Sequence, residues 1–454
     1  MNIYIDTLGC AKNEYDSQML AASLIDRGCR IAVSADEADI IIVNTCGFIE
    51  AAKRESIERI LELADAAGKA ENSNKSDIKL VVCGCLAEKY HEELAKELPE
   101  VDMFFGVNDY DDLPGILMGE YQTDESSDKV GRGLDDLRYR KREFEDGAHY
   151  GYLKIAEGCD NACSFCAIPS IRGPFRSKRI EDCIREAEDM ADAGIKELIL
   201  IAQDTSQYGK DLYGELRLPQ LLHELCKIDG IEWMRLMYVY DNGITDELID
   251  AIKNEDKICK YIDMPIQHIS DNVLKSMRRA SRSTSIKATI DKLRAEIPDV
   301  HIRTTILVGS PGETEKDIEE LVSFIEEYKL DRLGAFAYSD EDGTAAYEMV
   351  HKNPPEICEE RRDIIMQHQR AVSEKLNEAC LSKIYEVMID ERVYDSDEGE
   401  PLYVGRTRYD APEIDCEVTF TGPDGYEAGD IVNVRITSAY EYDLEGEIVN
   451  EYRD

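Results

Sequence analysis

The hydrophobic positions of the chain change their period along the sequence, and each period predicts a different kind of element. In residues 1–110, short apolar runs alternate with longer stretches in which apolar residues recur every three or four positions. The short runs predict buried strands and the longer stretches predict amphipathic helices. The expected strands are 3–6, 40–44 and 80–83, and the expected helices are 14–27, 51–67 and 88–98. This alternation predicts a parallel sheet with helices on its faces.

The alternation returns between residues 149 and 378, where a strand, a loop and a helix recur about six times. Six such units predict an incomplete parallel barrel, whose chemistry lies at the carboxyl ends of the strands. The expected strands are 152–156, 197–202, 233–239, 261–264, 303–308 and 332–338, and helical patterns include 180–193, 245–254, 286–295 and 315–328.

The last part of the chain has short strands of period two, at 383–390, 413–420 and 431–440, separated by Gly, Asp and Pro turns. This pattern predicts a small antiparallel β-barrel. Residues 111–148 are polar and highly charged, which predicts a partly mobile linker. The fold class is therefore α/β, with a Rossmann-like domain at 1–115, a linker at 116–148, a partial barrel at 149–378 and the β-barrel at 379–454.

Composition limits the functions that fit this organisation. With 454 residues, 43% hydrophobic and 33% charged, the chain is a soluble protein of several domains. It shows no apolar run long enough for a membrane span and no secretion signal, so we expect a cytoplasmic location with reduced cysteines. The net charge of −43 favours a basic partner and repels nucleic acid, so tRNA is not an expected partner.

Three cysteines in the segment GCDNACSFCAIPSIRG, Cys159, Cys163 and Cys166, are spaced C-x-x-x-C-x-x-C just after the first expected barrel strand. Three thiolates can bind three irons of an iron–sulfur cube and leave the fourth iron open to a cofactor or substrate. A zinc site with thiolate ligands is an alternative. A stripe of three buried cysteines on a helix is another, but the neighbouring Gly158 and Pro169 favour turns over a helix.

A second set of cysteines follows the three expected N-terminal strands: Cys10, Cys46 and Cys85. The carboxyl ends of neighbouring parallel strands meet at one edge of a sheet, so these thiols should converge in a second open site. Cys83 competes with Cys85, but it ends the strand, whereas Cys85 lies beyond Gly84 in the loop. The alternative is that all of them are small buried side chains at strand ends.

The chain resembles the radical S-adenosylmethionine (SAM) methylthiotransferases, whose C-terminal module is called TRAM. The resemblance covers nearly the whole chain. The family has a RimO-like branch, which modifies an aspartate of small-subunit ribosomal protein twelve, and a MiaB-like branch, which modifies a tRNA adenosine. The segments AIPSIRG and GRTRYDAPEID resemble the RimO-like branch more closely. The matching segments are TLGCAKNEYDS, NTCGFIEAAKRESI, YLKIAEGCDNACSFCAIPSIRGPFRSK, LIAQDTSQYG and GRTRYDAPEID. Tyr240-Asp241 and Gly309-Ser310 stand where relatives usually have Tyr-Pro and Gly-Phe.

The resemblance implies an enzyme with two 4Fe–4S clusters. The cluster on Cys159, Cys163 and Cys166 binds SAM and cleaves it to a 5′-deoxyadenosyl radical, which removes hydrogen from the β-carbon of the aspartate. The cluster on the other three cysteines carries the sulfur, and a second SAM supplies the methyl group. The reductant and the sulfur source stay unknown. Residues 383–454 hold 6 Lys and Arg against 20 Asp and Glu, which suits docking of a basic ribosomal protein.

Polar and glycine residues at the carboxyl ends of the barrel strands are candidate contacts for SAM. Ordinary loop capping is the alternative for each, and Glu313 or Thr314 also fits a helix cap. The candidates are Gln203, Asp204, Thr205, Gln267, His268, Gly309, Gly312 and Glu313. Arg172 and Arg176 are expected either to bind a carboxylate of substrate or cofactor or to be plain surface arginines.

Two other functions remain open from the sequence. The first is a tRNA methylthiotransferase, which should bind tRNA in a salt-sensitive way. The second is a metal or iron–sulfur scaffold without enzymatic activity, which would form no 5′-deoxyadenosine.

Overall fold

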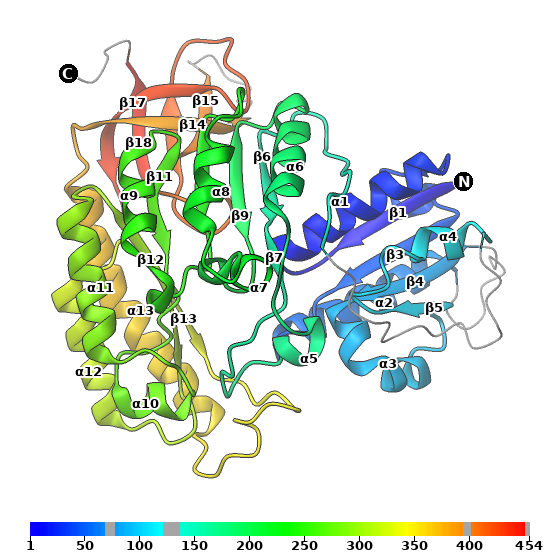
Figure 1. Cartoon of the computed structure of the whole chain (residues 1–454), viewed down its shortest axis with the longest axis horizontal. Helices are drawn as coiled ribbons and strands as arrows, with labels where there is room; N and C mark the ends of the chain where they lie inside the picture. Colours follow the sequence, from blue (N-terminus) through cyan, green and yellow to red (C-terminus); the bar gives the residue numbers. More distant parts are fainter. Residues whose placement is uncertain (69–77, 121–136, 394–400, 450–454) are drawn as a thin grey trace.

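The computed structural model describes residues 1–68, 78–120, 137–393 and 401–449. Three bodies follow one another along the chain (Figure 1): an N-terminal domain, a partial barrel and a C-terminal β-barrel. This confirms the predicted fold class, except that one strand pair of the C-terminal barrel, Val418–Thr421 with Leu444–Ile448, is parallel and not antiparallel. None of the described helices combines the length and the apolar character needed to cross a membrane.

The N-terminal domain is a five-stranded parallel sheet in the order β2-β1-β3-β4-β5. Its central strand β3 is buried along its whole length, because helices cover both faces, and its Ile-Ile-Ile-Val run suits such a position. The strands are β1 (Asn2–Thr7), β2 (Arg30–Ile31), β3 (Ile40–Thr45), β4 (Lys79–Gly84) and β5 (Met103–Phe105), and the helices are α1 (Ala11–Asp26), α2 (Glu50–Ala66), α3 (Cys85–Glu97) and α4 (Leu113–Leu117).

The barrel is an open sheet of six parallel strands in the order β13-β12-β11-β10-β9-β6, as the sequence predicted. The strands are β6 (Tyr150–Lys154), β9 (Glu197–Ile201), β10 (Trp233–Leu236), β11 (Ile258–Asp263), β12 (His301–Val308) and β13 (Arg332–Ala337), and a short pair is formed by β7 (Ala156–Glu157) and β8 (Arg176–Ser177). The helices are α5 (Ile168–Arg172), α6 (Ile180–Asp192), α7 (Lys210–Tyr213), α8 (Leu218–Leu225), α9 (Asp246–Asn254), α10 (Asp271–Ser276), α11 (Ser283–Glu296), α12 (Glu315–Tyr328) and α13 (Pro355–Glu378).

The C-terminal domain is a closed barrel in the order β14-β15-β16-β18-β17. Its strands are β14 (Ile384–Val393), β15 (Leu402–Thr407), β16 (Val418–Thr421), β17 (Ile431–Ala439) and β18 (Leu444–Ile448). The predicted strand 413–420 is wrong in its first half, because residues 408–417 form a loop that packs against the partial barrel. In this loop Asp410 pairs with Arg332 at 2.7 Å, and Asp415 accepts a hydrogen bond from Tyr261 at 2.6 Å.

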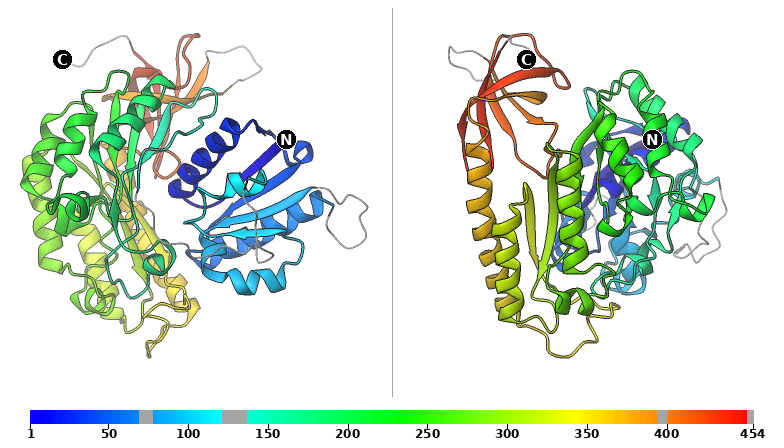
Figure 2. Two further views of the ribbon diagram at one scale, coloured as in Figure 1. Left: turned by 45° about the vertical axis from the view of Figure 1, so that its right-hand side comes forward. Right: turned by 60° about the vertical axis from the view of Figure 1, so that its left-hand side comes forward.

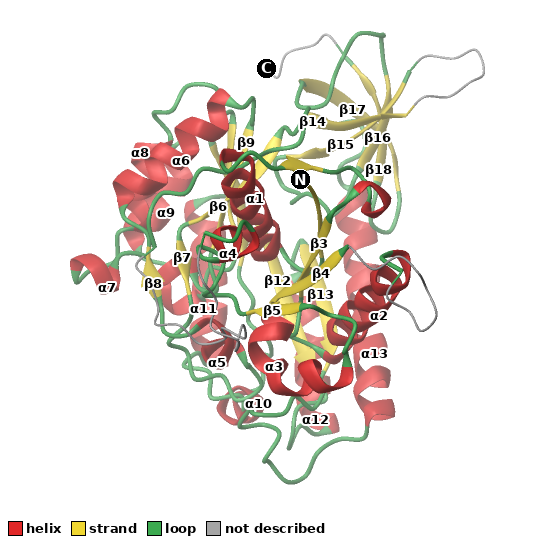
Figure 3. Cartoon of the chain, turned by 90° about the vertical axis from the view of Figure 1, so that its right-hand side faces the viewer, coloured by secondary structure: helices red, strands yellow, loops and turns green. Residues whose placement is uncertain are grey.

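The C-terminal barrel docks on the amino ends of the parallel strands, at the far end of the sheet from the cysteine loop (Figures 1 and 3). At the centre of this contact, fully buried Glu197 pairs with Arg235 at 2.6 Å and with Arg406 of β15. Burial alone would raise the pKa of Glu197, but the two guanidinium groups hold it below its usual range. The segment GRTRYDAPEID is therefore a docking element between domains.

The contact at Glu197 gives a stability prediction. Arg406→Met leaves a buried carboxylate with one cation in place of two, so we expect a loss of about 3 kcal/mol in the free energy of unfolding, measured by urea denaturation. Arg370→Met is the matched control, because Arg370 and its partner Glu441 are both more than half exposed, and it should have no measurable effect. Equal losses in the two variants would contradict the buried network.

A buried arginine anchors the predicted linker. Arg142 is 7% exposed and donates hydrogen bonds to the Tyr152 carbonyl at 2.7 Å and to Gln18 at 3.0 Å. Arg142 thus joins this part of the linker to β6 and to α1. Residues 121–136 lie outside the described part of the chain.

The N-terminal domain contacts β6 at one free edge of the open six-stranded sheet, and it contacts the loop that follows β13, the strand at the other edge (Figures 2 and 3). At the β6 edge, Lys154 pairs with Asp16 of α1 at 2.5 Å. Beyond the β13 edge, Glu341 pairs with Lys53 of α2 at 2.6 Å, and Asp342 pairs with Lys89 of α3 at 3.2 Å. The domain therefore bridges the opening of the incomplete barrel.

Candidate active site

The three N-terminal cysteines, Cys10, Cys46 and Cys85, converge as predicted at the carboxyl ends of the adjacent strands β1, β3 and β4. Cys10 is the N-cap of α1, Cys46 follows β3 and Cys85 begins α3. The loops are in direct contact: a Cβ placed on Gly9 would lie 2.6 Å from Cβ of Cys46. One placed on Gly47 would lie 2.7 Å from Cα of Leu86.

The turn at Gly84 separates the roles of Cys83 and Cys85. Gly84 has φ +101°, and a Cβ there would lie 2.4 Å from the Thr45 carbonyl oxygen, so only glycine fits. Cys83 stays in the strand, fully buried in a hydrophobic core with Phe105. Cys85 lies beyond the turn and packs instead against Ala167 of the partial barrel. This geometry favours Cys85 as the third ligand.

The barrel cysteines, Cys159, Cys163 and Cys166, lie in the loop between β7 and α5. No helix forms between residues 158 and 167, so the interpretation as a helical stripe is wrong. Gly158, with φ +78°, lets the loop pass close to the Pro174 carbonyl, where a Cβ would lie at 2.1 Å. The Ser164 amide donates to the Met277 carbonyl at 3.0 Å and anchors the centre of the loop.

Each barrel cysteine has a hydrogen-bond donor near its sulfur. Asn161 Nδ2 lies 3.5 Å from Cys159 Sγ, the Ile168 amide lies 3.5 Å from Cys166 Sγ, and Arg279 lies 4.0 Å from Cys163 Sγ. Donors of this kind tune thiolate ligands in proteins that bind a cluster. Arg279 is 4% exposed and stacks on the Tyr240 ring at 4.2 Å. Sequence reasoning missed Arg279, since its segment RRASRS has no spacing signal.

Burial makes these thiols weak acids in the absence of a metal. It raises the pKa of Cys166 to about 12 and the pKa of Cys85 to about 12, and for Cys85 the nearby Arg172 partly opposes the rise. A metal that binds the thiolates therefore displaces protons. Within the described residues, no group of three or more His, Cys, Asp or Glu side chains is arranged to hold a single metal ion.

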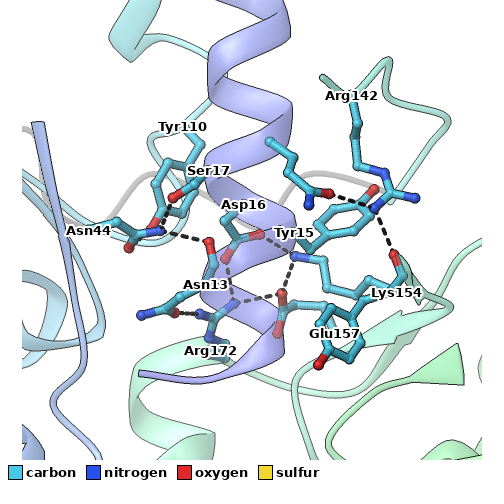
Figure 4. A network of polar contacts seen from close by, with 12 residues as sticks. Asn13, Tyr15, Asp16, Ser17, Asn44, Tyr110, Arg142, Lys154, Glu157 and Arg172 are labelled. Atoms are coloured by element: carbon cyan, nitrogen blue, oxygen red, sulfur yellow. Dashed lines mark hydrogen bonds and ion pairs between the residues drawn. The ribbon is translucent and has the colours of Figure 1, made fainter. Parts of the chain in front are cut away.

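A buried ion network joins the N-terminal domain to the partial barrel (Figure 4). Arg172 of α5 is 2% exposed, so the interpretation as a surface arginine is wrong. Its Nη1 donates to Asp16 at 3.0 Å and to Glu157 at 2.9 Å. Its Nη2 donates to Asn13 at 2.8 Å and lies 3.3 Å from Cys85 Sγ. Both terminal nitrogens therefore already bind protein groups.

Glu157 lies at the centre of this network. Burial alone would raise its pKa, but Arg172 and Lys154 hold it well below its usual range. Glu157 also accepts a hydrogen bond from Gln203 Nε2 at 2.7 Å, whereas Gln203 Oε1 is buried and has no hydrogen-bond partner. Of the predicted SAM contacts after β9, Gln203 is thus the one with an unused buried acceptor.

The other two predicted contacts after β9 hold the local structure. Asp204 caps the turn, because its side chain accepts a hydrogen bond from the Ser206 amide at 3.1 Å. It also accepts one at 2.9 Å from Asn161, the residue whose amide group lies beside Cys159 Sγ. Thr205 is fully buried and donates to the Met237 carbonyl at 2.8 Å. Capping, the alternative given above, describes both residues.

The predicted contacts after β11 and β12 are mostly packed inward. His268 is fully buried, and burial lowers its pKa to about 4. Glu313 accepts from the Gly309 amide at 2.8 Å and from Arg361 at 3.0 Å, and burial raises its pKa to about 7. Gln267 joins the edge of β12 through its backbone, with φ +70°. His268 and Glu313 therefore stabilise the loops, and their contact with SAM stays a prediction.

Gly312 and Arg176, the last two of the residues predicted to contact SAM or a carboxylate, lie apart from the packed loops described above. Gly312 has φ +82° with open space around it. Arg176, in β8, lines a cavity of about 80 Å³ between α1 and the partial barrel, together with Tyr15, Lys154 and Lys178.

Comparisons with known proteins agree with this architecture. The model of the Uncharacterized protein family UPF0004 matches residues 2–106, that of the Radical SAM superfamily matches 153–325, and that of the TRAM domain matches 383–449. The radical SAM methyltransferase TsrM from Kitasatospora setae has a TM-score of 0.59 at 12% identity, covering 88% of this chain and 79% of TsrM, which shows a shared fold. The fold and the cysteine loop thus define a radical SAM protein.

Curated relatives give the particular family. The ribosomal protein uS12 methylthiotransferase RimO of Acetivibrio thermocellus is 44% identical over 454 residues, covering 98% of both chains. That of Clostridioides difficile is 45% identical over 457 residues, covering 99% of both chains. This chain belongs to the RimO family.

Proposed function

We propose that this chain is a methylthiotransferase that inserts sulfur at the β-carbon of an aspartate of ribosomal protein uS12 and methylates it. The names of the full-length relatives support uS12 as the substrate. The tRNA alternative has less support, because the C-terminal barrel that would have to bind tRNA carries a net charge of −14. The same charge suits a basic ribosomal protein.

The observation on which this proposal depends is the contact between the segments that carry the two sets of three cysteines. Cys85 packs against Ala167, the residue after Cys166, and Arg172, at the end of the short helix that follows, lies 3.3 Å from Cys85 Sγ. A radical formed at one set and a sulfur held at the other would therefore act on the same substrate atom. A scaffold without activity would not need this proximity.

Each set fits a 4Fe–4S cluster by its donor chemistry, since three thiols suit three irons. We propose Cys159, Cys163 and Cys166 for the cluster that binds SAM, and Cys10, Cys46 and Cys85 for the auxiliary cluster. When bound, the groups supply one-electron cleavage of SAM and the sulfur to be inserted. The proposed domain limits are 1–115, 149–378 and 379–454, joined by 116–148.

Two groups beside the barrel cysteines are suited to hold SAM. Arg279 has a buried guanidinium whose hydrogen-bond acceptors are the Pro265 carbonyl and Cys163 Sγ, so it can take a carboxylate. The unused Oε1 of Gln203 can accept from an amine or a hydroxyl. Gln203, in turn, is held in place by Glu157.

Mass spectrometry of uS12 tests the function. Anaerobically purified protein with its iron, SAM, a reductant and sulfide should add a methylthio group to one aspartate of uS12. Total cellular tRNA under the same conditions should gain no methylthio-adenosine. Modification of tRNA with no change in uS12 would overturn the proposal in favour of the rival enzyme.

A further inference from the structure

Lys12, the second residue of α1, is a buried cation with no carboxylate partner among the described residues. It is 8% exposed, and its Nζ lies 3.3 Å from the centre of the Tyr238 ring. The two other buried lysines among the described residues, Lys154 and Lys178, differ from Lys12 because each has a carboxylate partner. Lys154 pairs with Asp16 and Glu157, and Lys178 pairs with Glu186. A buried ammonium that faces only an aromatic ring is costly unless an anion joins it.

Lys12 lies beside the N-terminal set of cysteines. It comes two residues after Cys10, and the next residue, Asn13, is 4.0 Å from Cys85 Sγ through its Oδ1. Its partner Tyr238 follows β10 by two residues and belongs to the apolar cluster that includes Tyr152 and Ala11. The ammonium therefore sits where the N-terminal domain meets the partial barrel.

The Tyr238 backbone is held firmly in an unusual conformation. Its φ is +58°, a value that non-glycine residues adopt at a cost. Its amide donates to Asp263 at 2.9 Å, and its carbonyl accepts from the Thr205 amide at 3.1 Å. These bonds fix the backbone that carries the ring beneath the Lys12 ammonium, so the position of the charge depends on both domains.

The loop after β10 presents a second tyrosine in the same way. Tyr240 lies under the guanidinium of Arg279, beside the barrel cysteines. Tyr238 and Tyr240 thus each support a buried cation that lacks a carboxylate within ion-pairing distance in the described parts of the chain. The proposed reaction brings two carboxylates to this region, one on SAM and one on the substrate aspartate.

We propose that Lys12 binds the side-chain carboxylate of the substrate and so selects an aspartate. This inference rests on the proposed function and assigns the substrate contact that it leaves open. The carboxylate adjoins the β-carbon, so a salt bridge to Lys12 positions the C–H bond that must be broken. A lysine suits the task because its ammonium is a compact charge with three donors.

Steady-state kinetics of the complete, iron-loaded protein test the inference, with uS12 carrying either Asp or Asn at the modified position. Lys12→Met removes the charge and keeps an unbranched side chain that is one atom shorter. We expect KM for the Asp substrate to rise about 10- to 100-fold and the preference for Asp over Asn to fall by a similar factor. Lys12→Arg should restore most of that preference. Lys89→Met, at the other interdomain contact, is the matched control and should leave KM unchanged.

The outcomes separate this inference from the proposed function. Should the wild type leave uS12 unmodified, the function itself would fail. Should the wild type act on uS12 while Lys12→Met retains both KM and the preference for Asp, Lys12 would be only a structural contact between domains, and the inference would be overturned. An iron content of Lys12→Met equal to that of the wild type shows that both cysteine sets remain intact.

Discussion

Cys163→Ala should abolish the formation of 5′-deoxyadenosine from SAM under reducing conditions. In the cluster proposed for the barrel cysteines, Cys163 is the middle ligand, and two thiolates on a loop do not hold a 4Fe–4S cluster with an iron free for SAM. The measurement is chromatography of the nucleoside after anaerobic incubation with dithionite. No other substitution should have a larger effect on the chemistry.

The matched control is Cys226→Ala, at the end of α8 and away from both sets. It should keep the full iron content and the full yield of 5′-deoxyadenosine. Persistent cleavage of SAM by Cys163→Ala would show that the barrel cysteines do not hold the SAM cluster.

Cys85→Ala should separate the two halves of the reaction. We expect the iron content to fall from about eight to about four per chain, because the auxiliary cluster loses a ligand while the barrel cysteines are intact. 5′-Deoxyadenosine should still form, whereas methylthiolation of uS12 should fall below detection. Iron analysis, nucleoside chromatography and mass spectrometry of uS12 measure the three quantities.

Cys83→Ala is the control for this variant, only two residues away. Cys83 is fully buried in the core of the N-terminal domain, so the change should cost about 1 kcal/mol of stability and leave the iron content near eight. If Cys83→Ala lost four irons and Cys85→Ala did not, the choice between these cysteines would have to be reversed.

The architecture could be predicted from the sequence because it depends on the local spacing of hydrophobic residues along the chain. Each of the six barrel strands was predicted within a few residues, since alternating apolar runs and helices determine a parallel sheet. The loop at 408–417 was the exception. Its alternating residues match a strand, but Asp410 and Asp415 bind Arg332 and Tyr261 of another domain, and such long-range pairs leave no periodic signal.

In the candidate site, too, features with a local sequence pattern could be predicted, whereas features that depend on long-range contacts could not. The convergence of Cys10, Cys46 and Cys85 followed from strand order alone. Arg172 could not be placed, because only the folded chain brings Asn13, Asp16 and Glu157 around its guanidinium. Lys12 was overlooked for a similar reason, since its sequence neighbours do not reveal that it lacks an acidic partner.

The network around Arg172 limits how this enzyme could be recombined with its relatives. The N-terminal domain contributes Asn13 and Asp16, whereas the partial barrel contributes Lys154, Glu157 and Arg172. In a chimaera that joins the first domain of one protein to the remainder of another, a difference at any of these five positions would leave unmatched groups at this seam, unless α1 were exchanged together with residues 154–172.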